Sequence, residues 1–133
     1  MKLSRASSYA LQAVAYMAVQ KKDDITASHL IAEKKGIPER FLLKVLKPLV
    51  SAQVLQSVKG PRGGYRLAKS ASDVSVLEVI EAVDGPIRGH TPMGRRENNN
   101  TINKKLDTVC SQAADQVRKV MGKVKISDLL LKD

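Results

Sequence analysis

Apolar residues near the amino terminus recur every three or four positions, which is the spacing of one face of an α-helix. Ser4 stands before this run, and serine is a favoured N-cap because its hydroxyl accepts a hydrogen bond from a free amide of the first turn. The charged residues 21–24 then interrupt the pattern, so we predict a first helix over residues 5–20. Its apolar positions are Ala6, Tyr9, Ala10, Ala13, Val14, Met17 and Ala18.

A second and a third helix are predicted next, with a tight turn between them. Thr26 is a favoured N-cap residue, and Ile25 and Leu30 occupy the two positions of a hydrophobic staple around it. Gly36 is suited to end this helix, because glycine readily adopts the left-handed conformation found there. Pro38 follows, and proline is favoured in the first turn of a helix. We therefore place helices over residues 26–35 and 38–51.

The third predicted helix has two distinct sides. Arg40, Lys44 and Lys47 recur at helical spacing on one of them. Pro48 lacks an amide hydrogen and its ring clashes with the carbonyl one turn earlier, so we expect a kink or an early end of the helix there. The apolar stripe predicted to enter the core consists of Phe41, Leu42, Val45, Leu46 and Leu49.

Residues 54–58 and 65–67 are predicted strands of a hairpin, joined by a glycine-rich turn. Beyond them, Ser75 and Glu78 have the spacing of a capping box, which opens a fourth helix that ends before Gly85. Residues 85–100 are polar and include three consecutive asparagines, so we expect a loop.

A long final helix is predicted over residues 101–122, followed by an apolar turn at 126–131. Its apolar stripe is narrower than a usual core-facing side and is typical of a helix that pairs with another helix. The residues of this seam are Ile102, Leu106, Val109, Ala113, Val117 and Val120.

The composition fits a mainly α-helical fold with a small two-stranded hairpin. The 133 residues include no tryptophan and one phenylalanine, so we expect a core of Leu, Val, Ile and Ala. This length fits either one domain or one small domain with an appendage. No apolar run approaches the roughly 20 residues of a membrane span, and we expect no signal peptide. The single cysteine excludes an intrachain disulfide framework and favours a reducing, cytoplasmic setting.

The net charge of +10 is unevenly distributed along the chain. Residues 1–70 carry 13 Lys and Arg against 4 Asp and Glu, whereas residues 71–133 carry 10 against 9. A basic first half beside a nearly neutral second half indicates a polyanion-binding module joined to a different part. A protein that is basic only for solubility is the alternative, and the motifs must decide between the two.

The order of helix, turn, helix and basic hairpin is that of a winged-helix DNA-binding domain. In such a domain the third predicted helix enters the major groove, where arginine can bind guanine through two hydrogen bonds. Leu43 on the same side either contacts a thymine methyl or touches another part of the protein. A solvated, charged side of an ordinary helical bundle is the alternative interpretation. The major-groove candidates are Pro38, Glu39, Arg40, Leu43, Lys44 and Lys47.

The glycine-rich turn of the hairpin strengthens the DNA-binding interpretation. Its glycines allow the backbone to turn sharply and to approach a duplex closely. Arginine is the residue type that enters a narrow minor groove, which assigns this role to Arg62. A nucleotide-binding glycine loop is a poor alternative, because no helix follows in the required way. The candidates in this wing are Lys59, Gly60, Pro61, Arg62, Gly63, Gly64 and Tyr65.

With these parts in order, the chain resembles the Rrf-two (Rrf2) family of bacterial winged-helix regulators, which includes IscR-, NsrR- and CymR-like proteins. The match is carried by Ser8–Ala10, Ile31–Ala32, Gly36–Ile37, Phe41–Leu42 and, most specifically, Gly60–Ala68. The resemblance implies a homodimeric, sequence-specific DNA-binding transcriptional regulator, usually a repressor, that binds a palindromic operator. It implies a winged helix at 1–85, a polar loop at 86–100, and a dimerisation helix with a closing turn at 101–133.

The resemblance also bears on single positions. Arg40 matches a base-reading position of the family, whereas Leu43 stands where the family often has an acidic residue, so the preferred DNA sequence stays open. We further assign contacts with DNA phosphates to Lys2, Ser4, Arg5, Ser8, Thr26 and Ser28.

The chain departs from the family at the sensor. Cluster-binding members place three cysteines between the fourth helix and the long helix, and residues 85–105 here contain none. Because an iron–sulfur cluster needs several thiolates, we expect no cluster, no metal and no other cofactor. Cys110 is either an inert, half-buried thiol or a redox thiol that crosslinks two subunits. His90 is either a solvated histidine or a pH or metal sensor, and the effector stays unknown.

Two other classes of function compete with DNA binding. A winged helix can serve as an adaptor that presents the same surface to an acidic protein. An enzyme is disfavoured, because no catalytic pair of carboxylates, no Cys/His metal spacing and no nucleophile motif stands out. Asp23 and Asp24 are better explained as part of a charged loop than as a catalytic pair.

Overall fold

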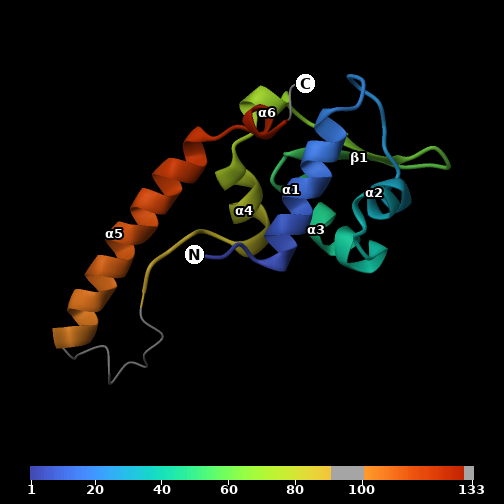
Figure 1. Ribbon diagram of the computed structural model, residues 1–133. Coiled ribbons are helices and arrows are strands. Elements are labelled where there is room, and N and C mark those ends of the chain that lie inside the picture. The colour runs from blue at the N-terminus through green and yellow to red at the C-terminus, as the bar shows by residue number, and fades with distance from the viewer. Residues whose placement is uncertain (91–100, 131–133) are drawn as a thin grey trace.

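Helices make up most of the computed structural model, which describes residues 1–90 and 101–130. In Figure 1, helices α1 to α4 pack together, a β-hairpin projects from them, and the long helix α5 extends away on the opposite side. The elements are α1 (Arg5–Ala18), α2 (Ser28–Lys35), α3 (Glu39–Ser51), β1 (Leu55–Val58), β2 (Gly64–Leu67), the short 3-10 helix η1 (Ala71–Asp73), α4 (Val76–Asp84), α5 (Thr101–Lys123) and α6 (Ile126–Leu129).

This architecture confirms the predicted class, a mainly α-helical chain with a two-stranded wing and a long helix near its C-terminal end. Positions 91–100 of the expected polar loop lie outside the described residues, as does residue 131 of the expected closing turn. None of the helices in the described part combines the length and the apolar character that crossing a membrane requires.

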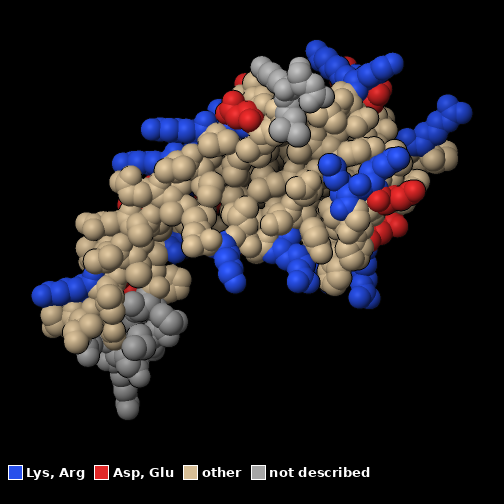
Figure 2. All heavy atoms as spheres, in the orientation of Figure 1, with Lys and Arg blue, Asp and Glu red and all other residues tan. Residues whose placement is uncertain are grey.

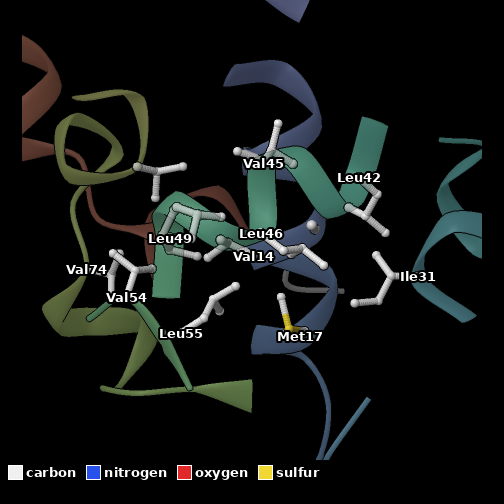
Figure 3. Close-up of a cluster of buried hydrophobic side chains, with 14 of the residues drawn as sticks. Val14, Met17, Ile31, Leu42, Val45, Leu46, Leu49, Val54, Leu55 and Val74 are labelled. Atoms are coloured by element: carbon white, nitrogen blue, oxygen red, sulfur yellow. The ribbon is translucent and has the colours of Figure 1, made fainter. Parts of the chain in front are cut away.

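The hydrophobic core lies where α3 meets α1 and α2. Figure 3 shows leucines of α3 pointing into a cluster that also holds Val14 of α1 and Ile31 of α2. Leu42, Leu46 and Leu49 have no exposed surface, and burying one such side chain contributes about 1.5–3 kcal/mol. α3 is therefore fixed by one side only, and its opposite side is free to meet a ligand.

Thr26 does not cap α2 as predicted. The cap position is occupied by Ala27, which offers no side-chain hydrogen bond. Thr26 instead forms an isolated antiparallel bridge with Tyr65 of β2. Threonine before an apolar run is a typical signal for an N-cap. Here the backbone of Thr26 pairs with the wing instead, and the cap lies one residue later than predicted. The left-handed conformation expected at Gly36 is confirmed, with φ of 65°.

Phe41 is not part of the core, contrary to the prediction, because its side chain is 45% exposed. It lies about 100° around the helix from Leu42, outside the apolar stripe and on the side that carries Arg40 and Lys44. Arg40 and Lys44 flank its ring, each cation 5.7 Å from the centroid.

Two expectations for the proline residues of α3 also need correction. Pro38 is the cap residue before the helix rather than part of its first turn. Pro48 does not end the helix, which continues to Ser51. Proline at this position removes one hydrogen bond near the C-terminal end, but helical bonding continues beyond it, and the amide of Ala52 donates to the carbonyl of Pro48 at 2.9 Å.

The last part of the chain returns to the helices that precede α5. Ser75 and Lys125 form an isolated antiparallel bridge, in which the amide of Ile126 donates to the carbonyl of Val74 at 2.8 Å. Ile126 has no exposed surface and belongs to the main core. We call α1 to α4, the hairpin, η1 and α6 together the body of the molecule.

The capping box predicted at the start of α4 is confirmed. The hydroxyl of Ser75 accepts a hydrogen bond from the amide of Glu78, and the Glu78 carboxylate accepts one from the amide of Ser75. Lys69 donates to the same carboxylate at 2.7 Å. Burial raises the pKa of Glu78, but these hydrogen bonds and the charges of Lys69 and Lys125 outweigh burial and hold the pKa below its ordinary value.

Candidate nucleic-acid interface

The outward side of α3 carries the cationic residues that were predicted to read the major groove. Arg40, Lys44 and Lys47 are exposed, and Leu43 between them is 43% exposed. Figure 2 shows lysine and arginine side chains at the lower edge of the body, where α3 lies in Figure 1. Because the opposite side of the helix holds the core leucines, these side chains stand on a rigid support.

The starts of α2 and α3 are linked by a hydrogen bond. The hydroxyl of Ser28 donates to the carboxylate of Glu39 at 3.2 Å. Glu39 and the neighbouring Pro38 are exposed at the beginning of the outward side of α3. Both residues of this bond were predicted to contact DNA, and in the free protein they bind each other and link the start of α2 to the start of α3.

The wing is a regular antiparallel hairpin. Its register pairs Gln56 with Arg66 and Val58 with Gly64. The turn between the strands contains Gly60, whose φ of 110° is a conformation that favours glycine. The tip residues Lys59, Gly60, Pro61 and Arg62 are all exposed.

Tyr65 lies at the base of the wing, away from its exposed tip. It is half-buried and packs against the hydrophobic core. Its neighbour Gly64 approaches the backbone of Thr26 so closely that a Cβ at position 64 would collide with the Thr26 carbonyl oxygen. The sequence interpretation assigned this glycine to close approach of DNA, whereas the structure shows that close approach of the protein's own backbone requires it.

The residues predicted to contact phosphates differ in exposure. Lys2, Ser4, Arg5 and Ser8 are exposed, and Ser28 is half-buried. Thr26 is only 5% exposed and has little surface to offer. Ser4 is the confirmed N-cap of α1, since its hydroxyl accepts a hydrogen bond from the amide of Ser7.

Asp84 is a structural neighbour of this region that the sequence did not indicate. Its carboxylate accepts hydrogen bonds from the hydroxyls of Ser4 and Ser7, each at 2.7 Å. These residues are 80 and 77 positions away from Asp84 along the chain, so no local pattern could reveal the link.

The predicted seam of α5 is largely exposed. Ile102, Val109 and Val120 are 66%, 59% and 62% exposed, Leu106 and Ala113 are also exposed, and Val117 is half-buried. Cys110 beside the seam is half-buried, and the backbone of Gly89 packs tightly against its carbonyl group. His90 is exposed.

Comparison with known proteins shows to which family the chain belongs. Residues 3–132 match the family model Rrf2, which is described as an iron-dependent transcriptional regulator. The chain belongs to the Rrf2 family. This Rrf2 protein is accordingly a DNA-binding transcriptional regulator with a winged helix-turn-helix, and the two relatives described next are named as transcriptional regulators rather than as enzymes.

Two relatives illustrate the similarity of sequence. An rrf2-like HTH-type transcriptional regulator of Rhodobacter capsulatus is 34% identical over 128 residues, which cover 94% of this chain and 82% of the relative. The HTH-type transcriptional regulator IscR of Photobacterium profundum is 26% identical, and the match covers 98% of this chain and 76% of the relative.

Solved structures establish the fold. CymR, the global cysteine regulator of B. subtilis, superposes with a TM-score of 0.77 over 97% of this chain and 95% of CymR, at 23% identity. IscR of T. potens superposes with a TM-score of 0.73 over 97% of this chain and 85% of IscR, at 22% identity.

The family description names iron, but the residues of this Rrf2 protein do not fit an iron–sulfur cluster. Such clusters are held by several cysteine thiolates, with histidine replacing some of them in certain types. The whole chain contains one cysteine, Cys110. In the described ranges 1–90 and 101–130, no three His, Cys, Asp or Glu side chains gather in a way that could hold a metal ion.

Proposed function

We propose that this Rrf2 protein is a homodimer that binds a palindromic operator, with α3 in the major groove and the wing in the adjacent minor groove. The outward side of α3 carries this proposal. It presents one arginine and two lysines around an exposed leucine on a helix that the core holds in place. A helix with that surface, followed by an exposed basic hairpin, has the form that fits a duplex.

Direct reading of bases is the proposed role of Arg40. Its guanidinium can bind the O6 and N7 atoms of guanine together, whereas Lys44 and Lys47 suit phosphates as point charges. Arg62 at the exposed tip of the wing has the chemistry that a narrow minor groove attracts. Lys2, Arg5 and Ser8 are proposed to contact phosphates at the edge of this interface.

Dimerisation is proposed to occur through α5. Leu106, Val109 and Val120 leave apolar side chains exposed along one stripe of a helix of 23 residues. Contiguous apolar surface of this kind marks protein interfaces, and two copies of one helix form a symmetric pair. A two-fold symmetric protein matches a two-fold symmetric operator, which is why we propose a palindrome.

Three further parts of the proposal concern regulation. We propose repression, because a dimer that covers its operator excludes other proteins from that DNA. We propose that the protein works without an iron–sulfur cluster, since one cysteine cannot supply the thiolates. A bacterial regulator meets its DNA in the cytoplasm, and we propose that location.

Selection from a random pool of duplexes tests the proposed function. The wild-type chain should enrich a two-fold symmetric sequence, and its affinity for the selected duplex should fall steeply between low and moderate salt. A chain that enriches no sequence and binds duplex DNA no better than it binds other polyanions would be an adaptor for an acidic partner. Anaerobic reconstitution with iron and sulfide should leave the protein without visible absorbance, and a bound, coloured cluster would contradict that part.

A further inference from the structure

One carboxylate connects three segments of the chain at the place where α5 meets the body. Glu81 of α4 accepts hydrogen bonds from Nε and Nη2 of Arg118 in α5, at 3.1 and 3.2 Å. The amide of Ile87, in the segment that follows α4, donates to the same carboxylate at 2.8 Å. The two-pronged geometry fixes direction as well as distance, because the guanidinium and carboxylate planes must align.

This junction is partly shielded from water. The side chain of Glu81 is 20% exposed and that of Arg118 is 46% exposed. Burial raises the pKa of Glu81, but the hydrogen bonds from Arg118 and Ile87 and the charge of Arg118 outweigh burial and hold the pKa below its ordinary value. The carboxylate is therefore ionised at neutral pH, and the ion pair is in place.

α5 is also attached near its C-terminal end, and farther along the helix Ala114 is buried and the backbone of Cys110 packs against Gly89. The amide of Val76 donates to the carbonyl of Val124, and the amide of Ile126 donates to the carbonyl of Val74, both at 2.8 Å. From this anchor the helix extends away from the body (Figure 1). Ile102 at its far end lies about 33 Å along the helix from Val124, so a tilt of about 10° at the anchor moves the far end by about 6 Å.

α4 is itself fixed to the first helix of the body. Asp84, three residues after Glu81, accepts the hydrogen bonds from Ser4 and Ser7 of the α1 start. α4 also packs against α1 and α3. α4 therefore connects α5 to α1 and α3 through direct contacts.

We propose that Glu81 is a positioning residue for DNA binding: together with Arg118 and the Ile87 amide it sets the direction of α5 relative to the body, and thereby the separation of the two α3 helices in the dimer. The inference rests on the proposed homodimer. It adds that a side-chain junction remote from the DNA determines the preferred spacing of the two half-sites.

Operator spacing is the readout that tests the proposal. The probes are duplexes that carry two copies of the half-site selected by the wild type, with the spacer between them varied one base pair at a time. Glu81→Gln and Arg118→Gln are compared with Lys119→Gln, which removes a neighbouring exposed charge from the same helix. Arg118→Lys keeps the charge and loses the two-pronged bond.

Wild type and Lys119→Gln should share one preferred spacing. Glu81→Gln and Arg118→Gln should bind that duplex about fivefold more weakly and discriminate less among spacings, with Arg118→Lys in between, while binding to a single half-site and dimerisation by sedimentation stay unchanged. Folded, dimeric variants that keep the wild-type spacing preference would overturn the inference alone. A wild type that binds these duplexes only as a monomer would overturn the proposed dimer as well.

Discussion

Thr26 and Tyr65 exchange two backbone hydrogen bonds, with N–O distances of 2.9 and 2.8 Å. Thr26 lies just before α2, and Tyr65 lies in the second strand of the wing. The bridge therefore fastens the wing to the beginning of the helix-turn-helix. If both parts touch DNA as we propose, their relative position is set before the DNA arrives.

Gly64→Ala should disrupt this bridge. A methyl group at position 64 collides with the Thr26 carbonyl, and forced overpacking of this kind costs about 1–3 kcal/mol. We expect a lower melting temperature and weaker binding of the selected duplex. The matched control is Gly122→Ala in α5, where the new methyl group meets only Leu77 Cδ2 at an ordinary 3.5 Å and should stabilise the helix by about 0.5–1 kcal/mol. Equal effects of the two substitutions would contradict the account of the bridge.

Truncation of Leu42 should lower the stability of the protein, whereas truncation of Phe41 should mainly weaken DNA binding. Leu42 has no exposed surface, so Leu42→Ala should destabilise the protein by about 2–5 kcal/mol in urea denaturation. Phe41 is 45% exposed, and Phe41→Ala should change the free energy of unfolding much less. Since Phe41 lies between Arg40 and Lys44, its truncation should weaken DNA binding instead. A large loss of stability in Phe41→Ala would place this ring in the core after all.

Arg40→Ala and Lys47→Ala should weaken binding in different ways. Loss of a two-pronged contact with a base should cost about 1–3 kcal/mol and relax selectivity at one position of the half-site. Loss of a phosphate contact should weaken all sequences alike and lower the salt dependence. Titrations of the selected duplex and of single-base variants at two salt concentrations distinguish the two patterns. If only Lys47→Ala lost selectivity, Lys47 would be the residue that reads a base and the proposed role of Arg40 would be wrong.

Acid should destabilise the protein through Glu78 and Glu81. Both carboxyls have a pKa in the folded protein below the ordinary value of 4.5. A lowered pKa stabilises the folded state fully above the ordinary value, and that stabilisation is lost as the pH falls through the lowered one. The melting temperature should therefore decline below about pH 4.5, and more gently in the Glu78→Gln, Glu81→Gln double variant. Parallel wild-type and variant curves would show that these two carboxylates do not contribute.

The local elements could be predicted from sequence because their signals lie within a few residues. The cap at Ser4, the left-handed Gly36 and the capping box of Ser75 and Glu78 each depend on chemistry within one turn. The outward cations of α3 followed from helical spacing alone. Such features need no knowledge of the tertiary fold.

The errors arose where a distant segment competes for a residue. Thr26 has the chemistry of a cap, but its backbone pairs with Tyr65 of the wing, which lies far along the chain. Phe41 is apolar at a plausible spacing, yet it faces the side of α3 that carries Arg40 and Lys44 rather than the side on which Leu42 is buried. Asp84 and Glu81 bind residues far away in the sequence, Ser4 and Arg118, and no local sequence pattern indicates these partners.

Hydroxyl-radical footprinting of the selected duplex tests the central claim most directly. A dimer with α3 in the major groove should protect two half-sites whose centres lie about 34–36 Å apart on one face of the duplex. The wing should add minor-groove protection beside each half-site. Arg62→Ala should remove that protection while leaving guanine N7 in the major groove protected from dimethyl sulfate. A single protected site, or uniform protection unrelated to sequence, would contradict the account.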